Sequence, residues 1–333
     1  MPLTTPNTAP AVRQVQSHDR TELDALSWPV ATGTLNFPAV TSLGPVRELG
    51  QPEWARTFTE IAHAGFDHVE ITDTWLRPGE LTALELDALA RSARDAGLRV
   101  AAVALIRGSV IAAEGGETNL RYSHDSLEAA AALGAPVVSV GLHEPLHPAQ
   151  RDVLWFWTRP GAGNDPTDAD LWRRAVDRLR ELGRHAADLG LLLSLEMYED
   201  TFLGTAASAV RLVEEIGMPN VGLNPDTGNL IRLHRPIEPW AEVLATVLPY
   251  TNYWHVKNYM RDEDPDTGHV VAMPTSLELG LIDYRWAVRE AVGAGFAGLL
   301  TCEQYGGDGL SVSASNREYL RSVLHPALRG GPR

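Results

Sequence analysis

The chain has a single cysteine, Cys302, among its 333 residues. An internal disulfide framework is therefore excluded, and this cysteine usage is typical of a protein from a reducing compartment. The sequence also has no apolar run near the ~18 residues that a membrane-spanning helix needs. Its first 23 residues are polar and lack the apolar core of a signal peptide. We therefore expect a cytoplasmic protein with no membrane partner.

Basic residues are scarce relative to acidic ones, at 28 against 43, and the formal net charge is −15. A chain this acidic repels the phosphate backbone of nucleic acids and the surface of anionic membranes. Neither is expected as a partner. Lysine is almost absent, because Lys257 is the only one and arginine supplies the other 27 basic residues.

Short β-branched or apolar runs alternate along the chain with longer amphipathic segments. Eight runs predict strands, at residues 30–37, 68–72, 99–106, 136–142, 191–196, 221–224, 251–256 and 298–303. The intervening segments and the last one predict helices, at residues 53–64, 80–96, 123–133, 169–189, 205–216, 238–248, 284–293 and 316–324. Repeated strand–helix units require a parallel sheet, and eight of them close best into a (β/α)8 barrel.

An open doubly wound sheet is the alternative architecture, but no G-x-G-x-x-G motif follows the first predicted strand. We therefore predict an α/β protein with one catalytic domain, a (β/α)8 TIM barrel at residues 26–328. A flexible arm at residues 1–25 precedes it and a short tail at 329–333 follows. The connections after strands four and seven, residues 143–166 and 258–280, are longer than turns. Both leave the C-terminal ends of strands, where the active sites of barrels lie.

Acidic and histidine side chains stand at the ends of the last four predicted strands. These ends read Leu-Ser-Leu-Glu196, Gly-Leu-Asn-Pro-Asp226, Tyr-Trp-His255 and Leu-Thr-Cys-Glu303, with spacings of 30, 29 and 48 residues. One unit of a ~250-residue barrel takes about 31 residues, and the long connection after strand seven accounts for the third spacing. Adjacent strands lie ~4.8 Å apart, so the four side chains can converge. Three carboxylates and one imidazole predict a site for one divalent ion, Mn²⁺ first, with Mg²⁺ or Co²⁺ as alternatives.

These motifs resemble the signatures of the xylose isomerase-like barrels. The resemblance is carried by Leu-Glu196-Met-Tyr-Glu199, Asn-Pro-Asp226-Thr-Gly-Asn, Trp-His255-Val-Lys257-Asn and Cys-Glu303. The family includes ketose 3-epimerases, hydroxypyruvate isomerase, inosose dehydratase and sugar phosphate isomerase/epimerase proteins. The resemblance implies that Glu196, Asp226, His255 and Glu303 hold one metal ion. It also implies that the two glutamates remove and return a proton next to a carbonyl, through an enediolate.

The resemblance also identifies two substrate-binding candidates. Glu199 matches a second, substrate-binding glutamate of the ketose epimerases. The position three residues after Asp226 holds a substrate hydroxyl in those enzymes through a histidine, but it is Asn229 here. This difference argues against a free ketohexose as the substrate and leaves the metal chemistry intact.

Four further residues near predicted strand ends are candidates for the site. Lys257 follows His255 by two residues, so strand alternation places both side chains on one side, and we predict a catalytic role for it. His143, directly after strand four, is a candidate general base, with His147 as a weaker one. Arg107, just past strand three, is expected either to bind substrate or to pair with Glu114.

Aromatic residues are expected around the upper rim of the barrel, where sugar rings and aromatic groups stack on such side chains. Trp155 and Trp157 are the predicted substrate-binding pair, accompanied by Trp75, Phe156, Trp254 and Tyr305. Together with the long loop, His143 and Asn229, this rim resembles the catalytic α subunits of bacterial C-glycoside deglycosidases. That resemblance implies a carbon–carbon lyase that releases an aromatic aglycone from a 3-oxo-C-glycoside, with a small β subunit as partner.

The preferred prediction is this metal-dependent lyase, and the alternative is a sugar isomerase or ketose 3-epimerase acting on a free sugar. An abasic-site endonuclease of the same fold is disfavoured, because that branch uses three metals and more histidine ligands. A non-enzymatic binding protein would require the four-residue cluster to be accidental. Family resemblance also implies an oligomer.

Overall fold

Within residues 23–329, which the computed structural model describes, eight parallel strands follow one another around a barrel. Their order is β8, β7, β6, β5, β4, β1, β12, β9, and a parallel bridge between Leu223 and Thr251 joins the two ends of the series. The strands are β1 (Val30–Gly33), β4 (His68–Thr72), β5 (Arg99–Ala104), β6 (Val137–Val140), β7 (Leu192–Glu196), β8 (Val221–Asn224), β9 (Trp254–Val256) and β12 (Leu300–Cys302). The fold is the predicted single-domain TIM barrel.

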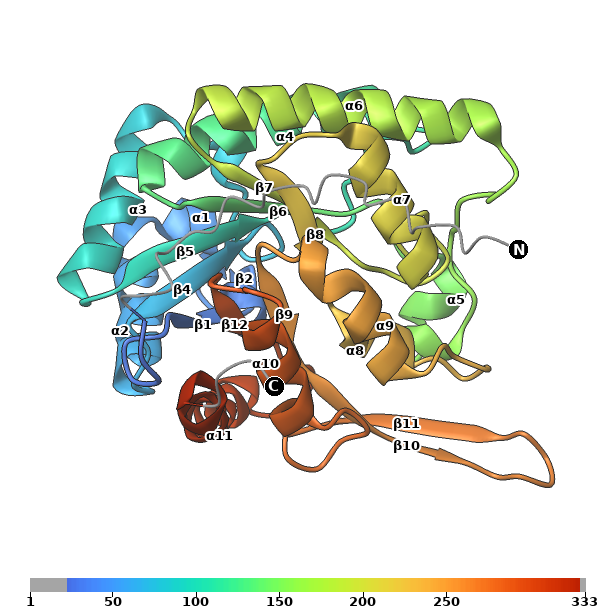
Figure 1. Cartoon of the computed structure of the whole chain (residues 1–333). Helices are drawn as coiled ribbons and strands as arrows, with labels where there is room; N and C mark the ends of the chain where they lie inside the picture. Colours follow the sequence, from blue (N-terminus) through green and yellow to red (C-terminus); the bar gives the residue numbers. More distant parts are fainter. Residues whose placement is uncertain (1–22, 330–333) are drawn as a thin grey trace.

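Helices cover the outside of this barrel (Figure 1). They are α2 (Gln51–His63), α3 (Ala83–Asp95), α4 (Gly116–Leu133), α6 (Ala169–Asp188), α7 (Ala206–Ile216), α9 (Trp240–Val247), α10 (Tyr284–Gly293) and α11 (Gly309–Arg329). Each turns an apolar stripe inward. In α6, for example, the buried residues recur every three or four positions from Trp172 to Ala186. Strands enclosed by helices are buried on both faces, which explains apolar runs such as those of β6 and β7.

Every predicted strand and helix is present, and most differences are at the ends. The predicted first strand, 30–37, stops at Gly33, because the chain turns into a 3-10 helix at Thr34–Asn36. The predicted seventh strand, 251–256, starts only at Trp254. The helices predicted at 123–133 and 316–324 are longer, since they begin at Gly116 and Gly309. The predicted arm and tail lie mostly outside the described residues, so that division stays a prediction.

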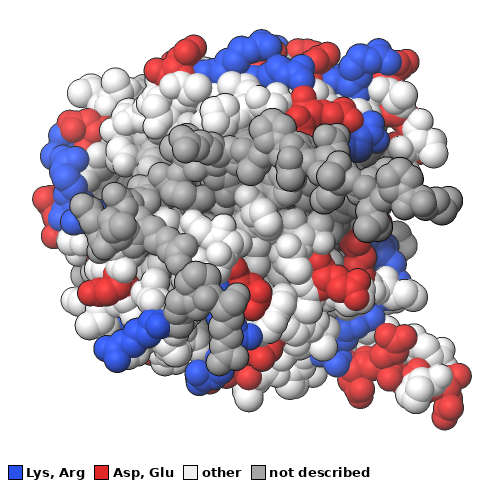
Figure 2. Space-filling view, viewed as in Figure 1, with Lys and Arg blue, Asp and Glu red and all other residues white. Residues whose placement is uncertain are grey.

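The connection after the seventh barrel strand is more ordered than the sequence suggested. It contains an antiparallel hairpin, β10 (Asn258–Glu263) and β11 (Val270–Thr275), which projects from the barrel (Figure 1). Figure 2 shows acidic side chains gathered on this projection, and Asp262, Glu263, Asp264 and Asp266 are exposed there. The turn at 264–268 ends at Gly268, whose φ of +67° suits glycine. Buried and exposed residues alternate from Val270 to Met273, but all four are apolar, so the sequence carried no period-two signal for this strand.

Several short elements complete the fold. A small hairpin, β2 (Val40–Thr41) with β3 (Gly44–Pro45), precedes α1 (Val46–Leu49). The connection after β6 contains α5 (Pro148–Arg151) and a 3-10 helix at Phe156–Thr158, and α8 (Thr227–Ile231) follows β8. Two further 3-10 helices lie at Pro78–Glu80 and Leu248–Tyr250. Among residues 23–329, no helix is long and apolar enough to cross a membrane.

The buried side chain of Asn258 fixes the projecting hairpin to the barrel. Its Nδ2 donates to the carbonyls of Leu277 and Ile282, both at 2.9 Å, and its Oδ1 accepts from the backbone N–H of Tyr259 and Ile282. We expect Asn258→Ala to lower the free energy of unfolding by about 2–4 kcal/mol, because buried partners lose their hydrogen bonds. Urea unfolding measures the effect. Arg173→Ala, which removes an exposed ion pair, is the control and should change stability by less than about 1 kcal/mol. An equal loss of unfolding free energy in Asn258→Ala and Arg173→Ala would contradict this role of Asn258.

Candidate metal centre

Four barrel strands bring one histidine and three carboxylates to a single point. Glu196 ends β7, His255 lies in β9, Glu303 directly follows β12, and Asp226 stands two residues after β8, at the start of α8. One potential ligand atom of each lies within 4.8 Å of the others. All four side chains are buried, with residue exposures of 6% or less. The convergence predicted from the strand spacing is therefore present in the structure.

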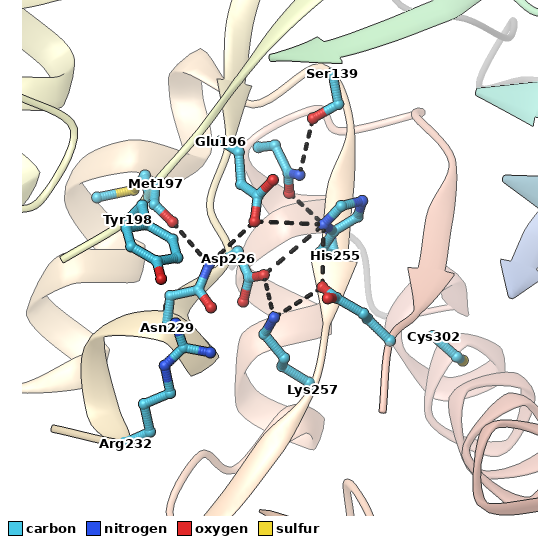
Figure 3. A network of polar contacts seen from close by, with 12 residues as sticks. Ser139, Glu196, Met197, Tyr198, Asp226, Asn229, Arg232, His255, Lys257 and Cys302 are labelled. Atoms are coloured by element: carbon cyan, nitrogen blue, oxygen red, sulfur yellow. Dashed lines mark hydrogen bonds and ion pairs between the residues drawn. The ribbon is translucent and has the colours of Figure 1, made fainter. Parts of the chain in front are cut away.

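The contacts of this cluster converge on one nitrogen of the His255 ring (Figure 3). Its Nδ1 lies 3.3 Å from Glu303 Oε2, 3.7 Å from Asp226 Oδ2 and 3.9 Å from Glu196 Oε1. This buried nitrogen has no hydrogen-bond partner among the described residues. A histidine nitrogen that faces three carboxylates is an arrangement that a divalent cation satisfies, and oxygen-rich donor sets suit hard ions such as Mg²⁺ or Mn²⁺. The residues present therefore fit a divalent ion, and this group could hold one.

The orientation of His255 is set by a residue that the sequence reading missed. Glu70, in the middle of β4, lies with Oε2 2.7 Å from His255 Nε2. The hydroxyl of Tyr253 donates to the same oxygen at 2.6 Å. A carboxylate on the far nitrogen fixes the tautomer of a metal-binding histidine and directs its other nitrogen to the ion. The signal was a carboxylate between two apolar residues, Val69 and Ile71, in the middle of this strand.

Lys257 lies inside the cluster. Its Nζ is 2.7 Å from Asp226 Oδ2 and 2.7 Å from Glu303 Oε2. Burial opposes the charge of this ammonium, but the two carboxylates raise the pKa of Lys257 well above its usual value. Gly228 makes room for the lysine stem, since a Cβ there would lie 2.3 Å from Lys257 Cγ. The lysine that was singled out from composition is thus a buried cation at the site.

The two glutamates differ in charge state. Burial raises the pKa of Glu196 to about 8, helped by Asp226 and Glu303 and opposed by His255. Burial acts the same way on Glu303, but Lys257 and His255 outweigh it and hold the pKa of Glu303 well below its usual range. Carboxyl groups with opposite pKa shifts are typical of sites that donate and accept protons.

Asn229 and Glu199 lie beside the cluster, with different partners. Asn229 Nδ2 donates to Glu196 Oε1 at 3.1 Å and to the carbonyl of Met197 at 3.0 Å, so it supports a ligand (Figure 3). Glu199 accepts from Arg232 Nη2 through both oxygens, each at 3.1 Å. Arg232 is fully buried, and its Nε and Nη1 have no partner among the described residues. The sequence reading missed Arg232; its spacing of three from Asn229, which itself follows Asp226 by three, was the available signal.

His143 and Arg107 stand at the mouth of the barrel. His143 is buried and stacks on Tyr198 with ring centroids 4.5 Å apart. Burial, with Arg107 and Arg232 nearby, lowers the pKa of His143 well below its usual value, so the ring is neutral. Arg107 donates to the Tyr198 hydroxyl at 2.9 Å and to the Glu144 carbonyl at 3.0 Å, rather than pairing with Glu114. His147, by contrast, is exposed at the start of α5.

The aromatic residues of the rim contact one another and two arginines, and the substrate-binding roles of Trp155 and Trp157 stay predictions. Trp155 and Trp157 stack on each other at 4.9 Å, and Trp157 is buried against Tyr305 at 5.8 Å. Phe156 lies 4.8 Å from the guanidinium of Arg232 and 4.7 Å from that of Arg107. These rings form an aromatic cover over Arg232. Trp75 and Trp254 are buried against Phe58 and Phe296, respectively, because both pack into the core.

A cavity lies beside this cover. It has a volume of about 230 Å³, and its lining includes Arg107, Trp157, Tyr198 and Glu199. None of the four clustered ligand residues lines it. The cover and the buried pair of Glu199 and Arg232 therefore separate this cavity from the metal centre.

Comparison with known proteins gives matches of three kinds, to a family model, to a curated protein and to solved structures. Residues 58–323 match the family model described as xylose isomerase-like TIM barrel. D-psicose 3-epimerase of Agrobacterium fabrum is 25% identical over 250 residues, which are 71% of this chain and 79% of that protein. The crystal structure of a xylose isomerase-like TIM barrel protein from Mycobacterium smegmatis in complex with magnesium has a TM-score of 0.88 and 40% identity, covering 92% of this chain and 99% of that one.

A more distant structure shares the fold alone. L-ribulose 3-epimerase has a TM-score of 0.64 at 18% identity and covers 90% of this chain and 96% of that one.

Glu70 orients His255. We therefore expect the charge of Glu70 to affect ion binding, although Glu70 does not contact the ion itself. We expect Glu70→Gln to weaken Mn²⁺ binding by about 10- to 100-fold, as loss of such supporting carboxylates does elsewhere. Isothermal titration of metal-free protein measures it. Glu278→Gln, on an exposed glutamate, is the control and should bind as the parent does. Unchanged affinity in Glu70→Gln would show that the orientation of His255 does not matter for ion binding.

Proposed function

The chain belongs to the family of xylose isomerase-like TIM barrels, and we propose that it is a divalent-metal-dependent isomerase or epimerase of a keto sugar. The observation that carries this proposal is the buried group of Glu196, Asp226, His255 and Glu303. The similarity to a D-psicose 3-epimerase supports this reading over the lyase. The aromatic rings, which suggested an aglycone, contact one another and two arginines instead.

The donor set narrows the choice of ion. Three carboxylates and one imidazole favour Mn²⁺ or Mg²⁺, with Co²⁺ as a third candidate. The related M. smegmatis protein is described in complex with magnesium. When bound, such an ion polarises a carbonyl group and makes the neighbouring C–H more acidic.

The two glutamates provide the acid–base chemistry. Around the barrel, β7 and β12 flank β8 and β9, so Glu196 and Glu303 lie on either side of Asp226 and His255. A sugar carbon held over the centre would therefore have one glutamate on each side. One carboxylate removes the proton from the carbon next to the carbonyl, and the other returns a proton to the opposite face or to the neighbouring atom.

Other residues position the substrate and exclude water. Asn229 holds Glu196 in place, and Lys257 is a fixed positive charge beside Glu303 that can stabilise a developing oxyanion. His143 Nδ1, Asn229 Oδ1 and Arg232 Nε and Nη1 are buried without partners among the described residues. Because unpartnered buried polar atoms are rare, they mark places where the hydroxyl groups of a sugar would bind. The small β subunit and the oligomer stay predictions.

An exchange experiment in D2O separates the proposed function from the lyase. Metal-free protein is reloaded with Mn²⁺ or Mg²⁺ and given D-psicose, D-fructose, D-tagatose or a 3-oxo-C-glucoside in parallel reactions. We expect deuterium to enter an intact, rearranged keto sugar, and chelation of the metal to abolish this exchange. Mass spectrometry detects both the deuterated keto sugar and any released aglycone. Release of an aglycone without exchange into any keto sugar would overturn the proposal.

Removal of one carboxylate tests the acid–base assignment. Glu303→Gln keeps the shape of the side chain but can no longer accept a proton, and it also loses a metal ligand. We expect turnover at saturating Mn²⁺ to fall by about 10²- to 10⁴-fold, the usual contribution of a general acid or base. Glu114→Gln, on an exposed glutamate, is the matched control and should retain parental turnover. Full activity in Glu303→Gln is the result that would remove Glu303 from the mechanism.

A further inference from the structure

A buried cation whose charge the proposed mechanism does not use lies beside the metal centre. Arg232 stands at the end of α8 and has no exposed surface. Asn229, three residues earlier, donates to the ligand Glu196, and Figure 3 shows Arg232 and Asn229 on the same side of the cluster. A sugar chain that extends from the metal centre on this side therefore leads to Arg232.

The guanidinium of Arg232 has more hydrogen-bond donors than acceptors around it. An arginine side chain carries five N–H groups, two of them on Nη2. Nη2 donates to both oxygens of Glu199, at 3.1 Å each. Nε and Nη1, which carry the other three, have no partner within residues 23–329. Buried donors without an acceptor are rare and costly, so we expect a ligand to supply one.

A second arginine, Arg107, lies against the same aromatic rings as Arg232. The centroid of the Phe156 ring is 4.8 Å from Arg232 Cζ and 4.7 Å from Arg107 Cζ. Both guanidinium groups also lie over the Tyr198 ring, at 5.3 Å for Arg232 and 5.5 Å for Arg107. The two cations therefore face one small region at the mouth of the barrel.

Negative charge is short in this region. Among the described residues, Glu199 is the one carboxylate in an ion pair with either guanidinium, and it pairs with Arg232. Burial lowers the pKa of the neighbouring His143, and both arginines lower it further. The two guanidinium groups thus carry one positive charge more than their carboxylate partner balances. A sugar hydroxyl accepts a hydrogen bond but does not balance this charge.

The Phe156 ring occupies the place where an acid would contact both arginines. The face of an aromatic ring carries partial negative charge, which is why cations lie over it. A carboxylate in that place would form charge-assisted hydrogen bonds, which are shorter and stronger than contacts to a ring. Phe156 is half-buried in the connection after β6, so its ring can move without loss of a barrel strand.

We propose that the substrate is a keto sugar acid whose carboxylate binds to Arg107 and Arg232 in place of the Phe156 ring. This inference rests on the proposed function, because the metal centre must hold the keto group of the same molecule. The surplus of one positive charge matches a carboxylate better than a phosphate group, whose charge at pH 7 is about −1.5 to −2. Arg107 is half-buried and lines the cavity beside the aromatic cover, so one of the two arginines is already accessible.

Matched pairs of keto sugars test this choice of substrate. D-Fructuronate and D-tagaturonate are D-fructose and D-tagatose with a carboxylate in place of the hydroxymethyl group farthest from the ketone. With Mn²⁺-loaded protein in D2O, kcat/KM for deuterium exchange is measured for both acids, both neutral sugars and D-fructose 6-phosphate. We expect kcat/KM to be about 10- to 100-fold higher for each acid than for its neutral counterpart, the usual effect of a hydrogen bond between charged groups. The phosphate sugar should react more slowly than the acids.

Removal of either arginine should remove the preference for acids. We expect Arg107→Met and Arg232→Met to lower kcat/KM for the acids by about tenfold or more relative to the neutral sugars. Arg289→Met, on an exposed arginine of α10, is the matched control and should keep the parental preference. Circular dichroism checks that each variant is folded. Arg107 is half-buried, so Arg107→Met decides the matter if Arg232→Met does not fold.

The possible failures of this inference and of the proposed function differ. Equal kcat/KM for the acids and the neutral sugars would overturn the inference and leave the proposed function intact. So would a preference for the phosphate sugar over the acids, or a preference for acids that persists in Arg107→Met. Absence of exchange with every keto sugar would overturn the proposed function, and the choice of an acid would fall with it.

Discussion

The site depends on the contact between His255 Nδ1 and the three carboxylates around it. Burying these acids together is costly, since each desolvated ion loses several kcal/mol of hydration and like charges repel. The structure offsets this cost with a buried ammonium, Lys257, which lies 2.7 Å from two of the carboxylates. Burial also favours the protonated form of Glu196, whose pKa rises to about 8. A divalent cation would stabilise the same cluster more strongly, so the charge balance of the site and its proposed metal binding have one physical basis.

The barrel supplies the rigidity that this cluster needs. Parallel strands in register deliver side chains from β7, β8, β9 and β12 to one end, which is where barrels carry their chemistry. Close packing below the ligands fixes them further. Gly33 leaves space for Glu70, since a Cβ there would lie 3.1 Å from its Oε1, and Asn224 accepts the backbone N–H of His255 at 2.7 Å. Substitutions at such supporting positions should therefore affect the site although they do not contact a substrate.

The sequence predicted those parts of the site that follow from periodicity. A spacing near one strand–helix unit placed Glu196, Asp226 and His255 together, and the long connection after the seventh strand accounted for the wider spacing to Glu303. Glu70 and Arg232 escaped notice because their importance comes from contacts between strands or loops that are distant in the chain. The contacts of the aromatic residues could not be predicted for a related reason. Composition placed rings near the rim, but it could not show that Trp155, Phe156 and Trp157 contact one another and two buried or half-buried arginines.

Pulsed electron paramagnetic resonance of Mn²⁺ bound to the protein tests the central claim most directly. The claim is that Glu196, Asp226, His255 and Glu303 hold one divalent ion through a single histidine nitrogen. The account predicts that the bound Mn²⁺ couples to one nitrogen-14 nucleus and that this coupling disappears in His255→Ala. Coupling that persists in that variant, or a bound ion that couples to no nitrogen at all, would contradict the account.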